Sequence, residues 1–86
     1  MAPVTPFWFK QRQAKADEAG PGLVRVSGPN VKEAFLGVRQ GESGLWSAFV
    51  RLTTDGQDIA ATPPEIDSAY GAWEAAFEIY RKQMVI

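Results

Sequence analysis

The chain has 86 residues, of which 45% are apolar and ten (five Phe, three Trp and two Tyr) are aromatic, and its formal net charge is −1. This length suits one domain with a single small core and excludes a buried cleft between two lobes. The absence of Cys and His excludes disulfides, thiolate nucleophiles and zinc knuckles, and it removes the commonest general base and metal ligand.

No stretch at the start of the chain is apolar enough for a signal peptide, and no segment is long enough to span a bilayer. We therefore expect a cytoplasmic protein with no membrane partner. Because the usual ligand residues and a two-lobed cleft are both missing, we also expect no cofactor, no metal and no small-molecule substrate.

The charges are unevenly distributed along the chain. Residues 10–51 hold seven bases and four acids, whereas residues 55–78 hold six acids and no base. The first of these regions can attract an anionic partner, and the second has the opposite sign.

Residues 1–31 give only weak secondary-structure signals. Residues 7–19 predict a short helix, which the Gly-Pro-Gly sequence at 20–22 ends, and residues 23–26 alternate weakly, as a short strand does. We therefore expect residues 1–31 to form an N-terminal arm beside a main unit of residues 32–86.

Three strands are predicted in the main unit. Residues 33–39 and 45–53 form two of them, joined across the Gly-rich residues 40–44, which predict a hairpin turn. A second turn is predicted at residues 54–56, where Asp55-Gly56 is a strong hairpin signal, and a shorter third strand follows at residues 57–61.

The C-terminal region gives the strongest signal, that of an amphipathic helix. Thr62 is a good N-cap, Pro63 suits the first helical position, and Glu65 completes a capping box with Thr62. The apolar residues that follow recur at spacings of three and four, which places them on one helix face: Ile66, Ala69, Tyr70, Trp73, Ala76, Phe77, Tyr80 and Met84.

These elements predict an α+β fold: a three-stranded antiparallel sheet packed against a C-terminal helix, with a short N-terminal helix or extended arm. Strand alternation assigns to the core Leu36, Val38, Trp46, Ala48, Val50 and Leu52. The opposite face, which the helix does not cover, carries Phe35, Arg39, Leu45, Ser47, Phe49 and Arg51. Two arginines with apolar residues between them make this face the candidate working surface.

The Gly-Glu-Ser-Gly sequence at 41–44 differs from a hydrolase nucleophile elbow, which needs Gly-x-Ser-x-Gly between a strand and a helix. Here the second glycine comes one place early, a strand follows, and the chain has no His to activate Ser43. The carboxylates of Glu65 and Asp67 are explained by a helix cap and a solvated helix face. We therefore expect a binding domain without enzymatic activity.

The aromatic sequence Phe7-Trp8-Phe9 has two interpretations. The rings can fold back over the open face of the sheet and complete the core, or they can form an exposed anchor for a partner. In the first case, Arg39 and Arg51 lose their access to a partner.

Residues 35–51, FLGVRQGESGLWSAFVR, resemble the APETALA-type, ethylene-response-factor DNA-binding domain, whose pattern is roughly YRGVRxRxWGKWxAEIR. The positions that match outright are Gly37, Val38, Arg39, Gly44, Trp46, Ala48 and Arg51, with Phe35 and Val50 as conservative replacements. Ala75-Ala76-Phe77 stands near the position of a similar sequence in the helix of that family, so the resemblance covers residues 35–81. Relatives of the family also occur in bacteria and phage.

The resemblance implies a three-stranded sheet backed by one helix, with the open face laid in the major groove of double-stranded DNA. Arg39 and Arg51 keep two of the contact positions on the first two strands. The other contact positions are replaced: Leu36, Gly41, Ser43 and Phe49 on the first two strands, and Gln57 and Ile59 on the third.

Two functions are therefore open on the sequence alone. In the first, the domain binds double-stranded DNA, using Arg39, Arg51, Lys32 and Ser47. Alternatively it binds a protein, as a phage-type inhibitor or a small accessory subunit of a larger complex does, using Phe35, Leu45, Phe49 and Trp8.

Overall fold

The computed structural model describes residues 5–53 and 56–85, with only the backbone of residues 84 and 85. These ranges hold two α-helices, α1 (Phe7–Gln11) and α2 (Ala69–Tyr80), and α2 continues into a short π-helix, η1 (Arg81–Val85). The strands in the same ranges are β1 (Lys15–Gly20), β2 (Leu23–Ser27), β3 (Ala34–Gln40), β4 (Trp46–Arg51) and β5 (Asp58–Ala61). No helix in this part of the chain combines the length and the apolar character needed to cross a membrane.

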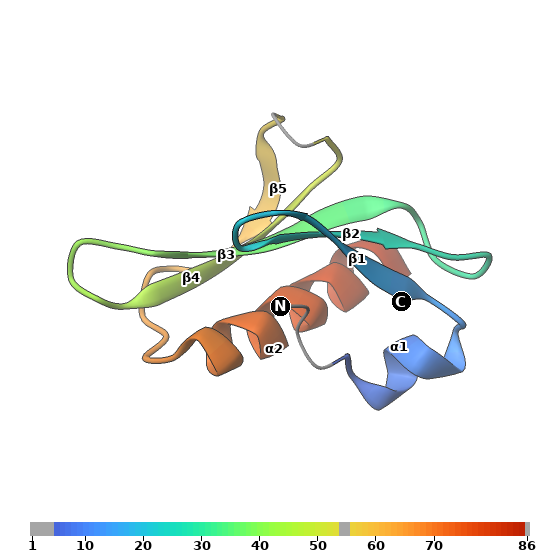
Figure 1. The fold of residues 1–86 in the computed structure, drawn as a ribbon, viewed down its shortest axis with the longest axis horizontal. Helices are drawn as coiled ribbons and strands as arrows, with labels where there is room; N and C mark the ends of the chain where they lie inside the picture. The colour runs from blue at the N-terminus through green and yellow to red at the C-terminus, as the bar shows by residue number, and fades with distance from the viewer. Residues whose placement is uncertain (1–4, 54–55, 86) are drawn as a thin grey trace.

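The strands form one antiparallel sheet in the order β1-β2-β3-β4-β5, and both helices lie on the same side of it (Figure 1). The α+β class with an antiparallel sheet is confirmed. The predicted number of three strands is wrong, because the described residues form five. The turn predicted at residues 54–56 falls partly outside the described residues, and β5 follows it close to the predicted position.

β1 is a strand that the sequence does not predict. The expected helix over residues 7–19 ends at Gln11, and Gln13 takes a positive φ of 59°. The chain then pairs β1 with β2 across a tight turn in which Gly22 has a φ of 66°. Because β1 is an edge strand with mostly exposed side chains, it lacks the apolar alternation that would reveal a strand. The predicted arm thus supplies two strands of the sheet.

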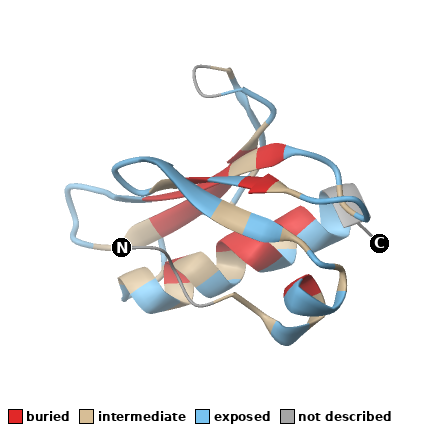
Figure 2. Ribbon diagram, turned by 45° about the vertical axis from the view of Figure 1, so that its right-hand side comes forward, coloured by how far each residue is buried: buried red, intermediate tan, exposed pale blue. Residues whose placement is uncertain are grey.

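The core lies between the sheet and α2 (Figure 2). The strand side chains buried there are Val24, Val26, Ala34, Leu36, Val38, Ala48 and Val50. The alternation predicted for β3 and β4 is therefore confirmed, with Trp46 partly buried against the cluster. Leu52 is the exception, since it lies beyond the end of β4 and is 55% exposed.

From α2, the residues Ala72, Ala76, Phe77 and Tyr80 are buried against the sheet. They confirm the predicted helix stripe in its central part. Tyr70 is 65% exposed, because it lies at the margin of that stripe. The side chain of Met84 lies outside the described residues.

α1 adds two rings to the core on the helix side of the sheet. Phe9 is fully buried, with its ring centroid 5.1 Å from that of Phe77 in an edge-on contact, and Trp8 stacks on Tyr80 at 6.5 Å. Phe7 is 75% exposed. Trp8 and Phe9 therefore complete the core, but the interpretation in which the Phe7-Trp8-Phe9 segment covers the open face is wrong, because α1 lies on the same side of the sheet as α2.

α2 begins later than predicted, and the predicted cap at Thr62 is wrong. Ser68 is the N-cap, and its side-chain oxygen accepts a hydrogen bond from the backbone N–H of Gly71 at 3.0 Å. Thr62 instead extends the pairing beside β4, where its N–H donates to the Ala48 carbonyl and its hydroxyl accepts from the Ala48 N–H, each at 2.9 Å. These bonds satisfy backbone groups of β4 that the short strand β5 leaves unpaired.

Replacing Phe9 with Ala should lower the free energy of unfolding by about 3–5 kcal/mol, because the ring is lost from a closely packed core. Phe7→Ala is the matched control on the same helix, and it should change the free energy of unfolding by less than about 0.5 kcal/mol. Urea denaturation followed by Trp fluorescence measures both variants. Equal and small effects would contradict the docking of α1 on the core.

Candidate functional site

The open face is the side of the sheet that neither helix covers (Figures 1 and 2). Directly opposed residues on neighbouring antiparallel strands point to the same face. Three such pairs of β3 and β4 point to the open face: Phe35 with Arg51, Gly37 with Phe49, and Arg39 with Ser47. The strand register therefore brings both predicted arginines beside the predicted aromatic residues.

Phe49 packs against the backbone of β3 at Gly37. A Cβ atom at Gly37 would come within 2.2 Å of Phe49 Cζ, so glycine is needed there to leave room for the ring. Phe49 is only 6% exposed although neither α1 nor α2 covers it. The side chains around it on the open face therefore provide its cover.

Arg39 and Arg51 provide part of that cover. Their guanidinium carbons lie over the Phe49 ring, 4.5 and 4.4 Å from its centroid. Both contacts have the geometry of a cation–π interaction. The side chain of Arg39 remains 49% exposed and that of Arg51 23% exposed, so Arg39 is the more accessible of the two.

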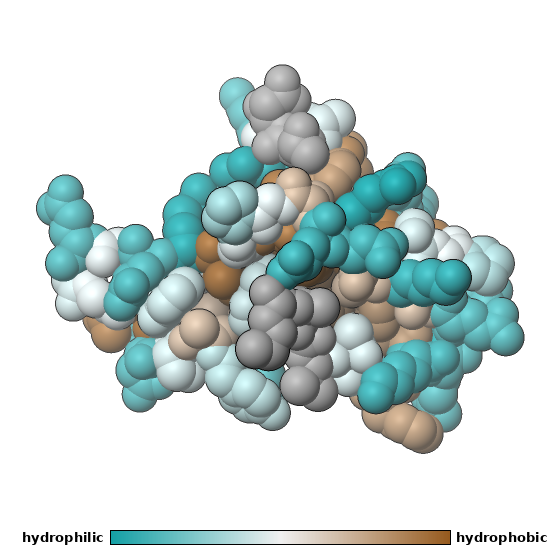
Figure 3. Space-filling view, viewed as in Figure 1, coloured by the Kyte–Doolittle hydropathy of each residue, from teal (hydrophilic) through white to brown (hydrophobic). Residues whose placement is uncertain are grey.

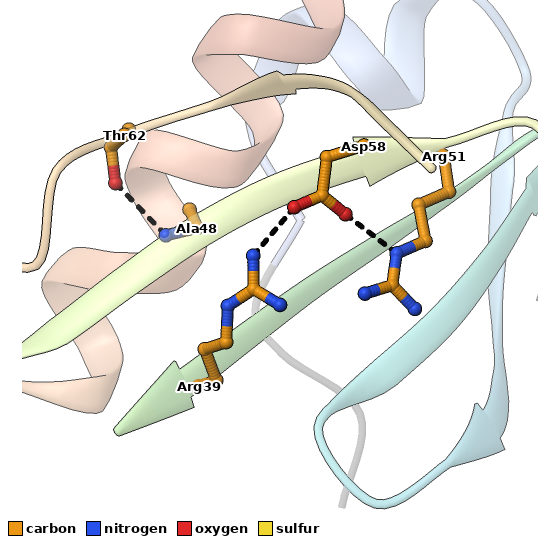
Figure 4. A network of polar contacts seen from close by, with 5 residues as sticks. All are labelled: Arg39, Ala48, Arg51, Asp58 and Thr62. Carbon is orange, nitrogen blue, oxygen red and sulfur yellow. Dashed lines mark hydrogen bonds and ion pairs between the residues drawn. The ribbon is translucent and has the colours of Figure 1, made fainter. Parts of the chain in front are cut away.

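Asp58 of β5 holds both arginines (Figure 4). One carboxylate oxygen accepts a hydrogen bond from Arg39 Nη2 and the other accepts from Arg51 Nε, each at 2.6 Å. Burial alone would raise the pKa of Asp58, but the hydrogen bonds from Arg51 and Arg39 and their charges outweigh burial and lower the pKa from its ordinary value of 3.8. The charged carboxylate therefore cross-links β3, β4 and β5.

A β-bulge in β5 directs Asp58 to the open face. Ala60 pairs with Val50, but the next pair joins Arg51 to Asp58, so Ile59 is an extra residue in β5. Without the bulge, Asp58 would share the face of Ala60, on the helix side of the sheet. Regular strand alternation therefore could not identify this partner of the arginines.

Of the eight residues predicted for binding, five lie together on the open face: Arg39, Arg51, Ser47, Phe35 and Phe49. Leu45 is half-buried before the start of β4, and Trp8 packs on Tyr80 on the helix side. Lys32 lies in the loop between β2 and β3, where its carbonyl oxygen accepts a hydrogen bond from the Tyr80 hydroxyl. Burial raises the pKa of Tyr80 to about 12, so this hydroxyl stays protonated at neutral pH.

Sequence reasoning missed three charged residues at this face: Arg25, Glu33 and Asp58. Arg25 of β2 lies opposite Phe35, and its guanidinium forms an ion pair with Glu33. It was missed because β2 was assigned to the N-terminal arm. A usable signal was the opposed pair Asp17 and Arg25 on β1 and β2, since opposite charges are favoured at directly opposed positions.

The Gly-rich residues 41–44 form the turn between β3 and β4, as predicted. The Gly41 N–H donates to the Leu45 carbonyl at 2.8 Å, and Gly44 has a φ of 88°, which favours glycine. The Ser43 hydroxyl oxygen accepts from the Leu45 N–H at 3.4 Å. The interpretation of this sequence as a hairpin turn is confirmed.

No protein family matches the chain, and comparisons with curated proteins and with solved structures gave no match. The resemblance of residues 35–81 to the ethylene-response-factor domain therefore stays a prediction from the sequence. The function must be argued from the site itself.

The Asp58 network should make stability depend on pH in the acid range. Because folding lowers the pKa of Asp58, its contribution is fully present above the ordinary value and is lost as the pH falls through the folded-state pKa. Asp58→Asn should therefore lower the free energy of unfolding by about 1 kcal/mol at neutral pH, and by less in strong acid.

Urea denaturation of both proteins across that pH range measures the difference. Asp67→Asn changes an exposed carboxylate outside the network and should leave the free energy of unfolding nearly unchanged throughout. A difference between wild type and Asp58→Asn that stays constant with pH would show that the carboxylate charge does not stabilise the cluster.

Proposed function

We propose that this chain is a small non-catalytic binding domain of the cytoplasm whose open face recognises another protein. The observation that carries the proposal is the cluster of Arg39, Phe49, Arg51 and Asp58. It holds a half-exposed guanidinium in a fixed position on a surface that neither α1 nor α2 covers.

The charges of the open face favour a protein partner over DNA. Among the described residues, four bases and three acids lie on or beside this face, a balance of 4 − 3 = +1: Lys15, Arg25, Arg39 and Arg51 against Asp17, Glu33 and Asp58. Affinity for DNA comes mainly from neutralising phosphates with excess positive charge. Here Glu33 and Asp58 already form ion pairs with three of the four bases.

Arg39 is the strongest candidate for an anchor. It donates one hydrogen bond to Asp58, and a guanidinium has further N–H donors to offer a partner. Because Phe49 and Asp58 already fix its position, little side-chain entropy is lost when a partner binds. Buried arginines are frequent among the residues that dominate binding energy in protein interfaces.

The aromatic residues of the open face differ in how they can contribute. Phe35 is half-buried and offers apolar surface next to Arg51. Phe49, which is 6% exposed, contributes by supporting the arginines. In Figure 3, which has the same viewpoint as Figure 1, hydrophilic residues cover most of the visible surface, with small hydrophobic areas between them. A partner that brings a carboxylate to Arg39 and an apolar side chain to Phe35 matches this arrangement.

Capture of partners from the native host tests the proposal with three forms of the protein. Wild type and Lys10→Glu should enrich the same partner, since Lys10 is exposed on α1, on the other side of the sheet. Arg39→Glu, which makes the same change in charge on the open face, should lose it. With the purified partner, Arg39→Ala should weaken binding by about 2 kcal/mol.

A titration with mixed-sequence duplex DNA at two salt concentrations separates the two classes of partner. Under our proposal DNA binds weakly, and Arg39→Glu changes that binding little. Tight DNA binding that falls steeply with salt and disappears in Arg39→Glu would instead support the DNA-binding function implied by the family resemblance. A captured partner that binds Arg39→Glu as well as wild type would exclude the open face as its site.

A further inference from the structure

A groove of about 650 Å³ lies between the residues at the start of α1 and one side of α2. Four aromatic residues line it: Phe77 is buried at its base, whereas Trp8, Tyr70 and Trp73 keep exposed surface. Two carboxylates, those of Glu74 and Glu78, also line it. Both α-helices lie on the side of the sheet opposite to the open face (Figure 1). This groove is therefore separate from the open face.

Helical spacing sets the order of these groups along the groove. Tyr70, Glu74 and Glu78 follow one another at intervals of four residues, so they form a single row along α2. Tyr70 is 65% exposed, and Trp8 and Trp73 are half-buried. Each of the three rings therefore keeps surface that a ligand can contact.

The charge of the groove is negative. Among its described lining residues there are two acids and no base. Glu78 forms an ion pair with Arg81 at 3.6 Å, in which both side chains are about half exposed (48% and 53%), and such exposed pairs are weak enough for a ligand to replace. Aromatic ring faces next to carboxylates attract organic cations, because the ring quadrupole and the carboxylate charge act in the same direction.

We infer that this groove binds a lysine-containing basic segment of a partner protein, as a second binding site beyond the open face. Glu74 and Glu78 are one helical turn apart, roughly 6 Å. Two negative charges at that separation match positive charges repeated along a peptide better than they match one small ion. The aromatic side chains then pack against the long aliphatic stems of the lysines.

The test uses a short peptide with two lysines, acetyl-Gly-Lys-Gly-Lys-Gly-amide, and a neutral version with norleucine in place of lysine. Two-dimensional NMR follows the indole N–H signals of the protein during each titration. The lysine peptide should shift the signals of Trp8 and Trp73 more than that of Trp46, which lies outside the groove lining. The norleucine peptide should shift all three signals little.

Two double variants give a matched control. Glu74→Gln with Glu78→Gln should weaken binding of the lysine peptide by roughly two- to fivefold for each carboxylate. Glu65→Gln with Asp67→Asn makes the same change in net charge at exposed positions outside the groove. That control should weaken binding by less than about twofold.

Single variants refine the assignment. Glu74→Gln should weaken binding more than Glu78→Gln, because the Glu78 carboxylate already forms an ion pair with Arg81. Tyr70→Ala should weaken binding by roughly two- to fivefold without a large change in melting temperature, since this ring is mostly exposed.

Several results would overturn the inference. Equal binding of the lysine and norleucine peptides would show that charge is not recognised, and equal weakening in the two double variants would show a diffuse attraction without a site. Tetramethylammonium chloride is the final probe. If it shifts the Trp8 and Trp73 signals at the same concentrations as the lysine peptide, the groove takes small organic cations rather than a peptide segment.

Discussion

Both helices in the described part of the chain pack on one face of the sheet, and this one-sided packing determines how the other face is built. Phe49 points away from the helices, so its cover has to come from neighbouring side chains. Gly37 leaves room for the ring, and Arg39 and Arg51 lie over it. Two positive charges close together need a counter-charge, which Asp58 supplies. Each part of the cluster thus follows from the need to cover one aromatic ring on the face that the two α-helices leave open.

The central strands could be predicted from the sequence because burial imposes a period of two on their residues. In β3 and β4, Val38 and Ala48 face the helix while Arg39 and Phe49 face away, and this alternation is visible without a structure. The edge strand β1 has no buried face of this kind, so its residues carried no such signal. The helix N-terminus was misplaced for a different reason.

Thr62 has the residue type of an N-cap, and the local pattern cannot show that the backbone of β4 competes for it. In the structure Thr62 pairs with Ala48, and Ser68 takes over the cap. Tertiary contacts thus override a good local signal. The same limit applies to the candidate site, where the arginines were predicted from alternation but Asp58 reaches them only through a bulge.

The two proposed binding surfaces lie on opposite sides of the sheet and differ in charge. The open face has a small positive balance, whereas the groove beside α2 is lined by Glu74 and Glu78. This separation reflects the sequence, in which residues 10–51 are basic on balance and residues 55–78 are acidic. If both proposals hold, a partner on one surface would leave the other accessible, and the domain would bridge two proteins that differ in charge.

The bulge in β5 also limits how the sheet can grow. An edge strand presents unpaired backbone groups to which another chain can add. Ile59 interrupts the regular spacing that such a strand would need, and β5 has only four residues. At the opposite edge, β1 carries the charged residues Lys15, Asp17 and Glu18, which oppose the stacking of identical strands. Both edge strands of the sheet therefore disfavour pairing with a strand of another chain. This protects the domain from fibril-like aggregation through its sheet edges while one face of the sheet stays open.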